Sequence, residues 1–125
     1  MNLSIDHFVL TTRNAGQCRR FYVEFLGMRE KIHEKHVSYH FGTYKINVHS
    51  YGHELEPKAH LPVPGSLDIC FSSSLSMQQI MTRAAEFGLP IIEGPGDHEG
   101  ANGTMTSVYL RDPDLNLIEI CHYQD

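Results

Sequence analysis

The sequence contains no tryptophan, only three cysteines and no long hydrophobic stretch. Cys18, Cys70 and Cys121 are odd in number and widely spaced among apolar neighbours, which argues against a disulfide framework or a CxxC metal site. We interpret them as small buried hydrophobic residues. No apolar run approaches the roughly 18 residues that a membrane-spanning helix needs. We therefore expect no membrane partner.

Basic clusters are also scarce. Ten Lys and Arg stand against fifteen Asp and Glu, a formal net charge of -5, and no basic run is longer than Arg19-Arg20. Binding to a phosphate backbone requires a basic patch, so nucleic acid is not an expected partner. The first six residues have neither the basic nor the apolar region of a secretory signal, so we expect a cytoplasmic protein. No phosphate-binding glycine loop or nucleophile elbow is present.

The first half of the chain reads as a strand, a helix and three more strands. Residues 3–11 alternate and are rich in Leu, Ile, Val, Phe and Thr, which predicts a strand. From Asn14, an N-cap residue, apolar positions follow helical spacing as far as Gly27. Further strands are predicted over residues 29–33, 37–42 and 44–49.

The second half repeats this order after a linker. Proline and glycine interrupt residues 51–65, which predicts an irregular segment. A strand at 67–71 then leads to a capping box, Ser76 to Gln79, and to a helix that ends at Gly88. Strands are predicted near 90–93, 105–111 and 116–122, with a glycine-rich loop over 94–103 and a hairpin turn over 112–116.

A repeat with a period near sixty residues constrains the fold strongly. We predict a single α+β domain over residues 1–125, with one module over about 1–50 and a second over about 66–125. Each module supplies a four-stranded curved sheet with a helix on its outer face. The two sheets together form an open eight-stranded sheet around a central cleft.

Polar residues within the predicted strands are the candidate site. His7 shares its face with the apolar Leu3, Ile5 and Val9, and Asp68 is the polar residue of the matching strand. Glu119 lies in the last strand, and its counterparts in the first module are Asn47 and, on the same face, His49. A carboxylate within a strand is costly to bury unless a cation or several donors compensate it.

Converging on a cleft, His7, Asp68, Glu119 and Asn47 would bind one divalent metal ion. Two carboxylates neutralise a 2+ ion, and a donor set of mostly oxygen favours Mn, Fe, Mg, Co or Ni over thiolate-bound Zn. Bland alternatives stay open: His7 as a hydrogen-bonded, half-buried histidine and Asp68 as the partner of a lysine. His49, His53 and His60, at or near the linker, read first as solvated surface. We interpret the other histidines as surface or strand-end residues: His33, His36, His40, His98 and His122.

Three segments carry a resemblance to a known family: residues 5–10, residues 20–28, and the run from Arg111-Asp112-Pro113-Asp114 to Glu119. They resemble the vicinal oxygen chelate superfamily, which includes glyoxalase I, fosfomycin-resistance thiol transferases, extradiol dioxygenases and metal-free bleomycin-binding proteins. Residues 45–49 and 52–68 are similar to glyoxalase domain-containing protein 5 and its single-domain bacterial relatives.

The resemblance implies paired βαβββ modules, a metal bound at the strand positions and a homodimer. His7 matches the family's first-strand ligand, and Glu119 matches its last-strand ligand and catalytic carboxylate. Asp68 stands where glyoxalase I and the dioxygenases have histidine, and Asn47 where glyoxalase I has glutamate. Glu119 is then the metal-bound carboxylate left to move a proton, with Asp68 as an alternative base.

Two functions follow, and a noncatalytic structural role also stays open, because a fold does not fix a function. The first is a metal-dependent enzyme that chelates a small oxygenated substrate, of lyase, isomerase or dioxygenase type, with Asn47, His49 and His60 as additional ligands or pocket residues. The second is a metal-free protein that binds a small molecule or antibiotic, as in bleomycin resistance.

Overall fold

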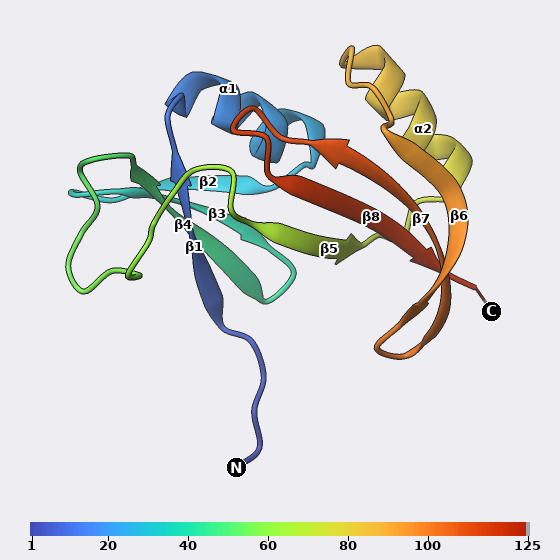
Figure 1. Cartoon of the computed structure of the whole chain (residues 1–125), viewed down its shortest axis with the longest axis horizontal. Coiled ribbons are helices and arrows are strands. Elements are labelled where there is room, and N and C mark those ends of the chain that lie inside the picture. The colour runs from blue at the N-terminus through green and yellow to red at the C-terminus, as the bar shows by residue number, and fades with distance from the viewer. Residues whose placement is uncertain (125) are drawn as a thin grey trace. The chain divides into compact units, whose positions relative to one another are not determined.

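The computed structural model describes residues 1–124, and the chain divides into two compact units, Met1–Ser66 and Leu67–Asp125. We call them unit one and unit two. Unit one contains β1 (His7–Thr12), α1 (Ala15–Arg19), the π-helix η1 (Arg20–Phe25), β2 (Arg29–Ile32), β3 (Val37–Phe41) and β4 (Tyr44–Ser50) (Figure 1). Unit two contains β5 (Asp68–Ser72), α2 (Met77–Glu86), β6 (Glu93–Gly100), β7 (Gly103–Arg111) and β8 (Leu117–Tyr123).

Both units have the same topology. The strand order is β1-β4-β3-β2 in unit one and β5-β8-β7-β6 in unit two. In each sheet the first strand pairs in parallel with the last one, and the other neighbours are antiparallel. The prediction of an α+β fold with a repeated order of strand, helix and three strands is therefore confirmed.

The helix of unit one begins and ends where the sequence predicts. The Asn14 side chain accepts a hydrogen bond from the backbone N–H of Gln17, 3.0 Å away, which satisfies one of the free donors of the first turn. Gly27, with φ of 80°, lies just past the last turn, in a conformation that glycine adopts without strain. The buried face carries Cys18, Phe21, Tyr22 and Phe25, and the rings of Tyr22 and Tyr39 stack at 6.1 Å.

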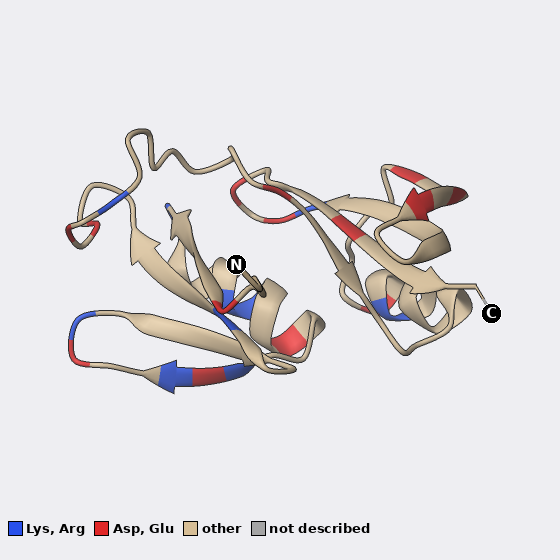
Figure 2. Cartoon of the chain, turned by 90° about the horizontal axis from the view of Figure 1, so that it is seen from below, with Lys and Arg blue, Asp and Glu red and all other residues tan. Residues whose placement is uncertain are grey.

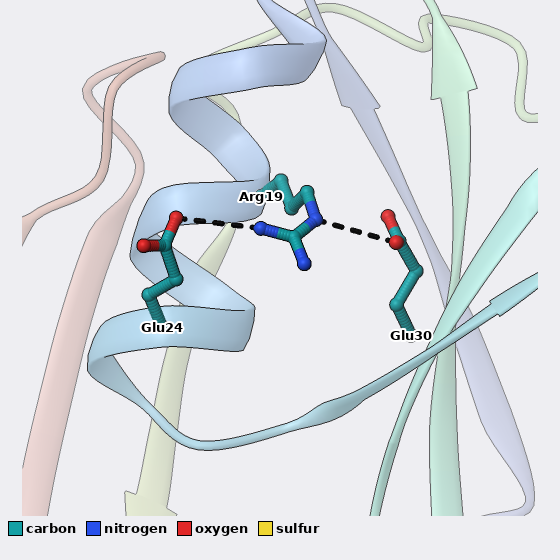
Figure 3. A network of polar contacts seen from close by, with 3 residues as sticks. All are labelled: Arg19, Glu24 and Glu30. Carbon is teal, nitrogen blue, oxygen red and sulfur yellow. Dashed lines mark hydrogen bonds and ion pairs between the residues drawn. The ribbon is translucent and has the colours of Figure 1, made fainter.

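A charged contact ties this helix to the edge strand β2. The Arg19 guanidinium lies 3.2 Å from the Glu30 carboxylate and 3.4 Å from that of Glu24 (Figure 3). Both pairs are partly exposed, so they orient the helix more than they stabilise it. Acidic and basic residues alternate along β2 itself, from Arg29 to Lys31 (Figure 2). Among residues 1–124, no helix is long and apolar enough to span a bilayer.

The helix of unit two carries the predicted capping box. Ser76 Oγ accepts from the backbone N–H of Gln79, and the Gln79 side chain accepts from the backbone N–H of Ser76. Ile80 and Ala84 form its buried face. The irregular segment over residues 51–65 is also confirmed, since it contains neither helix nor strand.

Two predicted boundaries are wrong. The first strand begins at His7, not at residue 3, because β4 begins at Tyr44 and offers no partner further upstream. Leu3 and Ile5 lie outside the strand and are exposed. The strand predicted near residues 90–93 spans Glu93–Gly100 instead, so the glycine-rich residues 94–100 form most of β6 and not a loop.

The backbone of β6 approaches β7 closely. A Cβ added to Gly94 would lie 2.6 Å from the carbonyl oxygen of Ser107, so the missing side chain is what permits this approach. Cross-strand bonds then fix the pair, with Thr104 Oγ1 donating to Glu99 Oε1 at 2.6 Å. As an edge strand, β6 also tolerates Pro95.

The hairpin turn over residues 112–116 is confirmed and is held by one buried carboxylate. Asp112 Oδ1 accepts from the backbone N–H groups of Asp114 and Asn116, both at 2.9 Å, and Oδ2 accepts from the Asn116 amide at 2.8 Å. Asn116 Oδ1 in turn accepts from the backbone N–H of Leu67 at 2.8 Å, which fixes the entry to β5. The turn therefore aligns both β5 and β8.

We predict that Asp112→Ala lowers the free energy of unfolding by about 3 kcal/mol, because it leaves several buried donors without an acceptor. Urea unfolding followed by circular dichroism measures this. Leu115→Gly is the control, since Leu115 is exposed and has φ of 68°, so glycine relieves strain there without removing a buried bond. Equal midpoints for Asp112→Ala and the parent chain would contradict the role given to this turn.

Candidate functional site

In unit one, the parallel pairing of β1 with β4 brings two predicted site residues together. His7 lies opposite Lys45 and Val9 lies opposite Asn47, so His7 and Asn47 are diagonal neighbours on one face of the sheet. His49 lies two residues further along the same face, opposite Thr11. His60 is exposed in the irregular segment and lies outside the sheet.

The ring of His7 is oriented by its neighbour in the chain. Its Nδ1 lies 2.7 Å from Asp6 Oδ1, and 44% of the His7 side chain is exposed. This hydrogen bond and the His7 charge hold the pKa of Asp6 below its ordinary value. An Nδ1–H that donates to the Asp6 carboxylate leaves Nε2 with a free lone pair, the arrangement found in metal-binding histidines.

Asn47 has an unusual amide. Its Oδ1 is buried and has no hydrogen-bond partner among the described residues. A buried polar atom without a partner costs free energy, so such an atom in a functional protein points to a ligand or an ion. The same is true of a second oxygen, in unit two.

That second oxygen is Oε2 of Glu119 in β8, which is also buried and unpartnered in the described structure. Glu119 lies between Cys70 of β5 and Tyr109 of β7 in the register of the sheet. Asp68 is exposed and lies opposite Leu117, on the same face and diagonal to Glu119. Unit two thus brings Asp68 and Glu119 together, as unit one does His7 and Asn47.

The residues beside Glu119 respond to its charge. Burial is the main cause that raises the pKa of the Tyr109 hydroxyl, and the Glu119 carboxylate raises it further. Burial also raises the pKa of the Cys70 thiol, followed by contacts with Cys121 and Glu119. Both neighbours are therefore protonated at neutral pH and face the carboxylate with a hydrogen that can be donated.

Each unit presents donors of the kind that a hard divalent cation prefers. Unit one has an imidazole and an amide oxygen, unit two has two carboxylates, and one oxygen in each unit is buried without a partner. No group of three or more His, Cys, Asp or Glu side chains among residues 1–124 is placed so as to hold a metal ion.

The sequence interpretation missed two features near these residues. Cys70 is exposed and is not a buried hydrophobic residue, whereas Cys18 and Cys121 are buried as predicted, and none of the three forms a disulfide. Cys70 lies on the outward face of β5, and the alternation of side chains along this strand could have predicted that position. Tyr109, one strand away, was not singled out.

His33 and His36 were interpreted as surface or strand-end residues, but both line a cavity in unit one. Their spacing, on either side of a two-residue turn, is the sequence signal that could have paired them. This cavity also includes His49 and His53.

Comparison with known proteins gives consistent relatives. The sequence model of the Glyoxalase/Bleomycin resistance protein/Dioxygenase superfamily matches residues 4–120. The chain is 42% identical over 120 residues to virulence protein STM3117 of Salmonella typhimurium. This alignment covers 95% of this chain and 83% of that protein. The chain is also 42% identical over 123 residues to glyoxalase domain-containing protein RDO1 of Mycosarcoma maydis. This second alignment covers 98% of this chain and 69% of that protein.

Solved structures give the same result. The crystal structure of the Salmonella protein aligns with a TM-score of 0.95 at 41% identity, over 99% of both chains. An integron cassette protein from Vibrio cholerae aligns with a TM-score of 0.94 at 40% identity, over 99% of this chain and 98% of that one. A lactoylglutathione lyase from Agrobacterium tumefaciens, 20% identical, shares the fold with a TM-score of 0.73, over 98% of this chain and 95% of that one.

We predict that Glu119→Gln speeds the alkylation of Cys70 by iodoacetamide several-fold, about tenfold if the pKa of Cys70 falls by one unit. Removing the Glu119 charge lowers that pKa, so more thiolate is present at pH 8. The rate is measured by mass spectrometry on EDTA-treated folded protein, in which Cys18 and Cys121 are buried. Glu86→Gln, an exposed change on α2, is the matched control, and equal rates in both variants would show that Glu119 does not act on this thiol.

Proposed function

The chain belongs to the Glyoxalase/Bleomycin resistance protein/Dioxygenase superfamily, and on that premise we propose that it is a metal-dependent enzyme for a small oxygenated substrate. The metal is one divalent ion, of Mn, Fe, Ni, Co, Mg or Zn, held by His7, Asp68 and Glu119, with Asn47 as an additional oxygen donor. The reaction is of lyase, isomerase or dioxygenase type.

One observation carries the proposal: the buried, unpartnered Oε2 of Glu119. Tyr109 and Cys70 lie beside the carboxylate, yet Oε2 accepts no hydrogen bond within the described part of the chain. A buried carboxylate oxygen left in this way is expected where a cation completes the site. The unpartnered Oδ1 of Asn47 supports the same conclusion from the other unit. The hydrogen bond from His7 to Asp6 supports a ring held ready to bind through Nε2.

The bound ion would polarise a carbonyl or orient dioxygen. The chain itself supplies proton transfer and orientation. Glu119 is the catalytic base, because its carboxylate is buried while its neighbours Tyr109 and Cys70 keep their protons. Asp68, exposed on the adjacent strand, is the second carboxylate that can accept a proton. Asn47 binds without adding charge, so Asp68 and Glu119 together balance a 2+ ion.

Relatives in the family often dimerise, and we extend this to a homodimer here. None of the three cysteines forms a disulfide, which fits a reducing, cytoplasmic location. His49 and His60 are candidates for further ligands or pocket residues, and His60 lies in the irregular segment that connects β4 to β5 along the chain.

We predict that protein purified without chelator retains close to one divalent ion per chain, and that His7→Ala and Glu119→Ala each weaken metal binding at least tenfold. Elemental analysis and competition with a chromogenic chelator measure this, and light scattering on the same samples is expected to give the mass of a dimer. Glu86→Ala is the control, and His60→Ala tests the linker histidine. Full metal retention by both His7→Ala and Glu119→Ala would refute this ligand set.

Turnover separates the enzyme from its alternative. We expect the protein to convert either the hemithioacetal of methylglyoxal and glutathione or a catechol, to lose this activity in EDTA, and to regain it when a divalent ion is returned. Product formation is followed by absorbance, under anaerobic and aerobic conditions. Ligand binding that EDTA does not affect, with no turnover, would instead identify a metal-free small-molecule or antibiotic-binding protein.

A further inference from the structure

Unit one contains a cavity of about 310 Å³ that the proposed function does not use. It lies where the β2–β3 hairpin turns and where β1 and β4 end, and all of its lining residues belong to unit one. His33, His36, His49 and His53 contribute four imidazoles to its wall. This volume lies at the lower end of the range of ligand pockets, roughly 300–1,000 Å³.

The imidazoles form an ordered wall. The rings of His33 and His36 stack with centroids 4.5 Å apart and 13° between their planes, and the ring of His49 lies 6.2 Å from that of His36, nearly perpendicular to it. His33 is fixed from behind, since its Nε2 lies 2.8 Å from Oγ of the fully buried Ser38. The wall is therefore organised before any ligand binds.

One atom of this wall lacks a partner. Nε2 of His36 is buried and makes no hydrogen bond within the described part of the chain. Because buried polar atoms are almost always paired, this nitrogen indicates a hydrogen-bonding atom that a ligand would supply. It is independent of the unpartnered oxygens of Asn47 and Glu119, which lie on other positions of the sheets.

The ring geometry does not favour a metal ion. A nitrogen lone pair lies in the plane of its ring, so the parallel rings of His33 and His36 direct their lone pairs along parallel planes that do not converge on one point. Consistently, no three metal-binding side chains of residues 1–124 are grouped to hold an ion. Imidazole N–H groups can instead donate in parallel to a ligand with several acceptor atoms.

The charge at the cavity favours an anion. Lys35 is part of the lining, and no carboxylate is among the lining residues that the structure describes. Glu54, which is not among the lining residues, raises the pKa of His49 and so opposes the larger lowering effect of burial. Burial lowers the pKa of His33, and the nearby His36, Lys31 and Lys45 add to the effect, so its ring is neutral at neutral pH. Lys35 supplies a full positive charge to the lining.

The rest of the lining combines apolar side chains with hydroxyl groups. Val37, Val48 and Leu55 face the same space as the imidazoles, together with the hydroxyl residues Thr12 and Ser50. An apolar lining with a few convergent donors is typical of sites for small organic molecules.

We propose that this cavity binds a small planar organic carboxylate of one or two rings. His36 Nε2–H and Lys35 donate to the carboxylate, and the ring lies against the imidazoles and the valines. The cavity lies beyond the proposed metal donors along the strands: its His49 is two positions, about 7 Å, from Asn47, and pairs with Thr11, four positions, about 13 Å, from His7. The proposed binding of a carboxylate does not depend on whether the chain binds a metal.

The test uses 2-naphthoate as the probe and its neutral amide, 2-naphthamide, as the matched control, titrated into EDTA-treated full-length protein and followed by two-dimensional NMR. We expect saturable binding of 2-naphthoate, at least tenfold tighter than binding of the amide. The shifted backbone signals are expected to cluster in residues 33–37 and 48–55.

His36→Phe removes the nitrogen but keeps an aromatic ring that stacks on His33, and we expect it to weaken 2-naphthoate binding at least fivefold while the protein keeps its thermal midpoint. Lys35→Gln is expected to do the same, and Glu86→Ala, an exposed change on α2 of unit two, is the control. All three variants are expected to retain the metal stoichiometry of the parent chain. An absence of 2-naphthoate binding can therefore be distinguished from an absence of bound metal.

Equal affinity for the acid and the amide, no binding of either, or signal shifts confined to other residues would each overturn the proposal. A second titration adds zinc ions alone to EDTA-free protein. Zinc binding that shifts the signals of residues 33–37 would also overturn the proposal, because a metal site would then explain the imidazoles.

Discussion

The parallel pairing of the first and last strands within each unit is the constraint on which the rest of the structure depends. Because β1 pairs with β4 and β5 with β8, residues from the two ends of each repeat lie side by side. His7 and Asn47 become neighbours in unit one, and Asp68 and Glu119 in unit two. A change of one residue in either register would move one member of each pair to the helix-covered face.

The same pairing explains why polar atoms are tolerated within the sheets. Glu119 Oε2 and Asn47 Oδ1 are buried without partners, and each such atom costs about 1–3 kcal/mol of stability if nothing binds it. The helix-covered faces carry the apolar core, including Leu10, Ile46 and Ile118, which offsets this cost. The proposed metal donors lie on the faces that the helices leave uncovered.

Much of this arrangement follows from the sequence. The repeat, both helix caps and the Asp112 turn are local patterns with known geometry, and they were predicted correctly. The start of β1 was not, because a strand extends only as far as its partner, and the partner is distant in sequence. The strand over residues 94–100 was missed because its glycines and proline disfavour strands, whereas edge pairing to β7 overrides that preference.

The strand registers place His7 beside Asn47 and Asp68 beside Glu119, but the other neighbours of these residues did not follow from the sequence. Cys70 and Tyr109 flank Glu119 only because of the register of unit two. The stacking of His33 on His36 depends on the conformation of a two-residue turn, which strand and helix patterns do not describe.

The central claim is that His7 and Glu119 bind the same ion. The most direct measurement is pulsed electron paramagnetic resonance of the Mn²⁺-loaded protein. We expect a coupling from one directly bound imidazole nitrogen, which disappears in His7→Ala, together with loss of bound Mn²⁺ in Glu119→Ala. A spectrum without nitrogen coupling, or a coupling that survives in His7→Ala, would contradict the account.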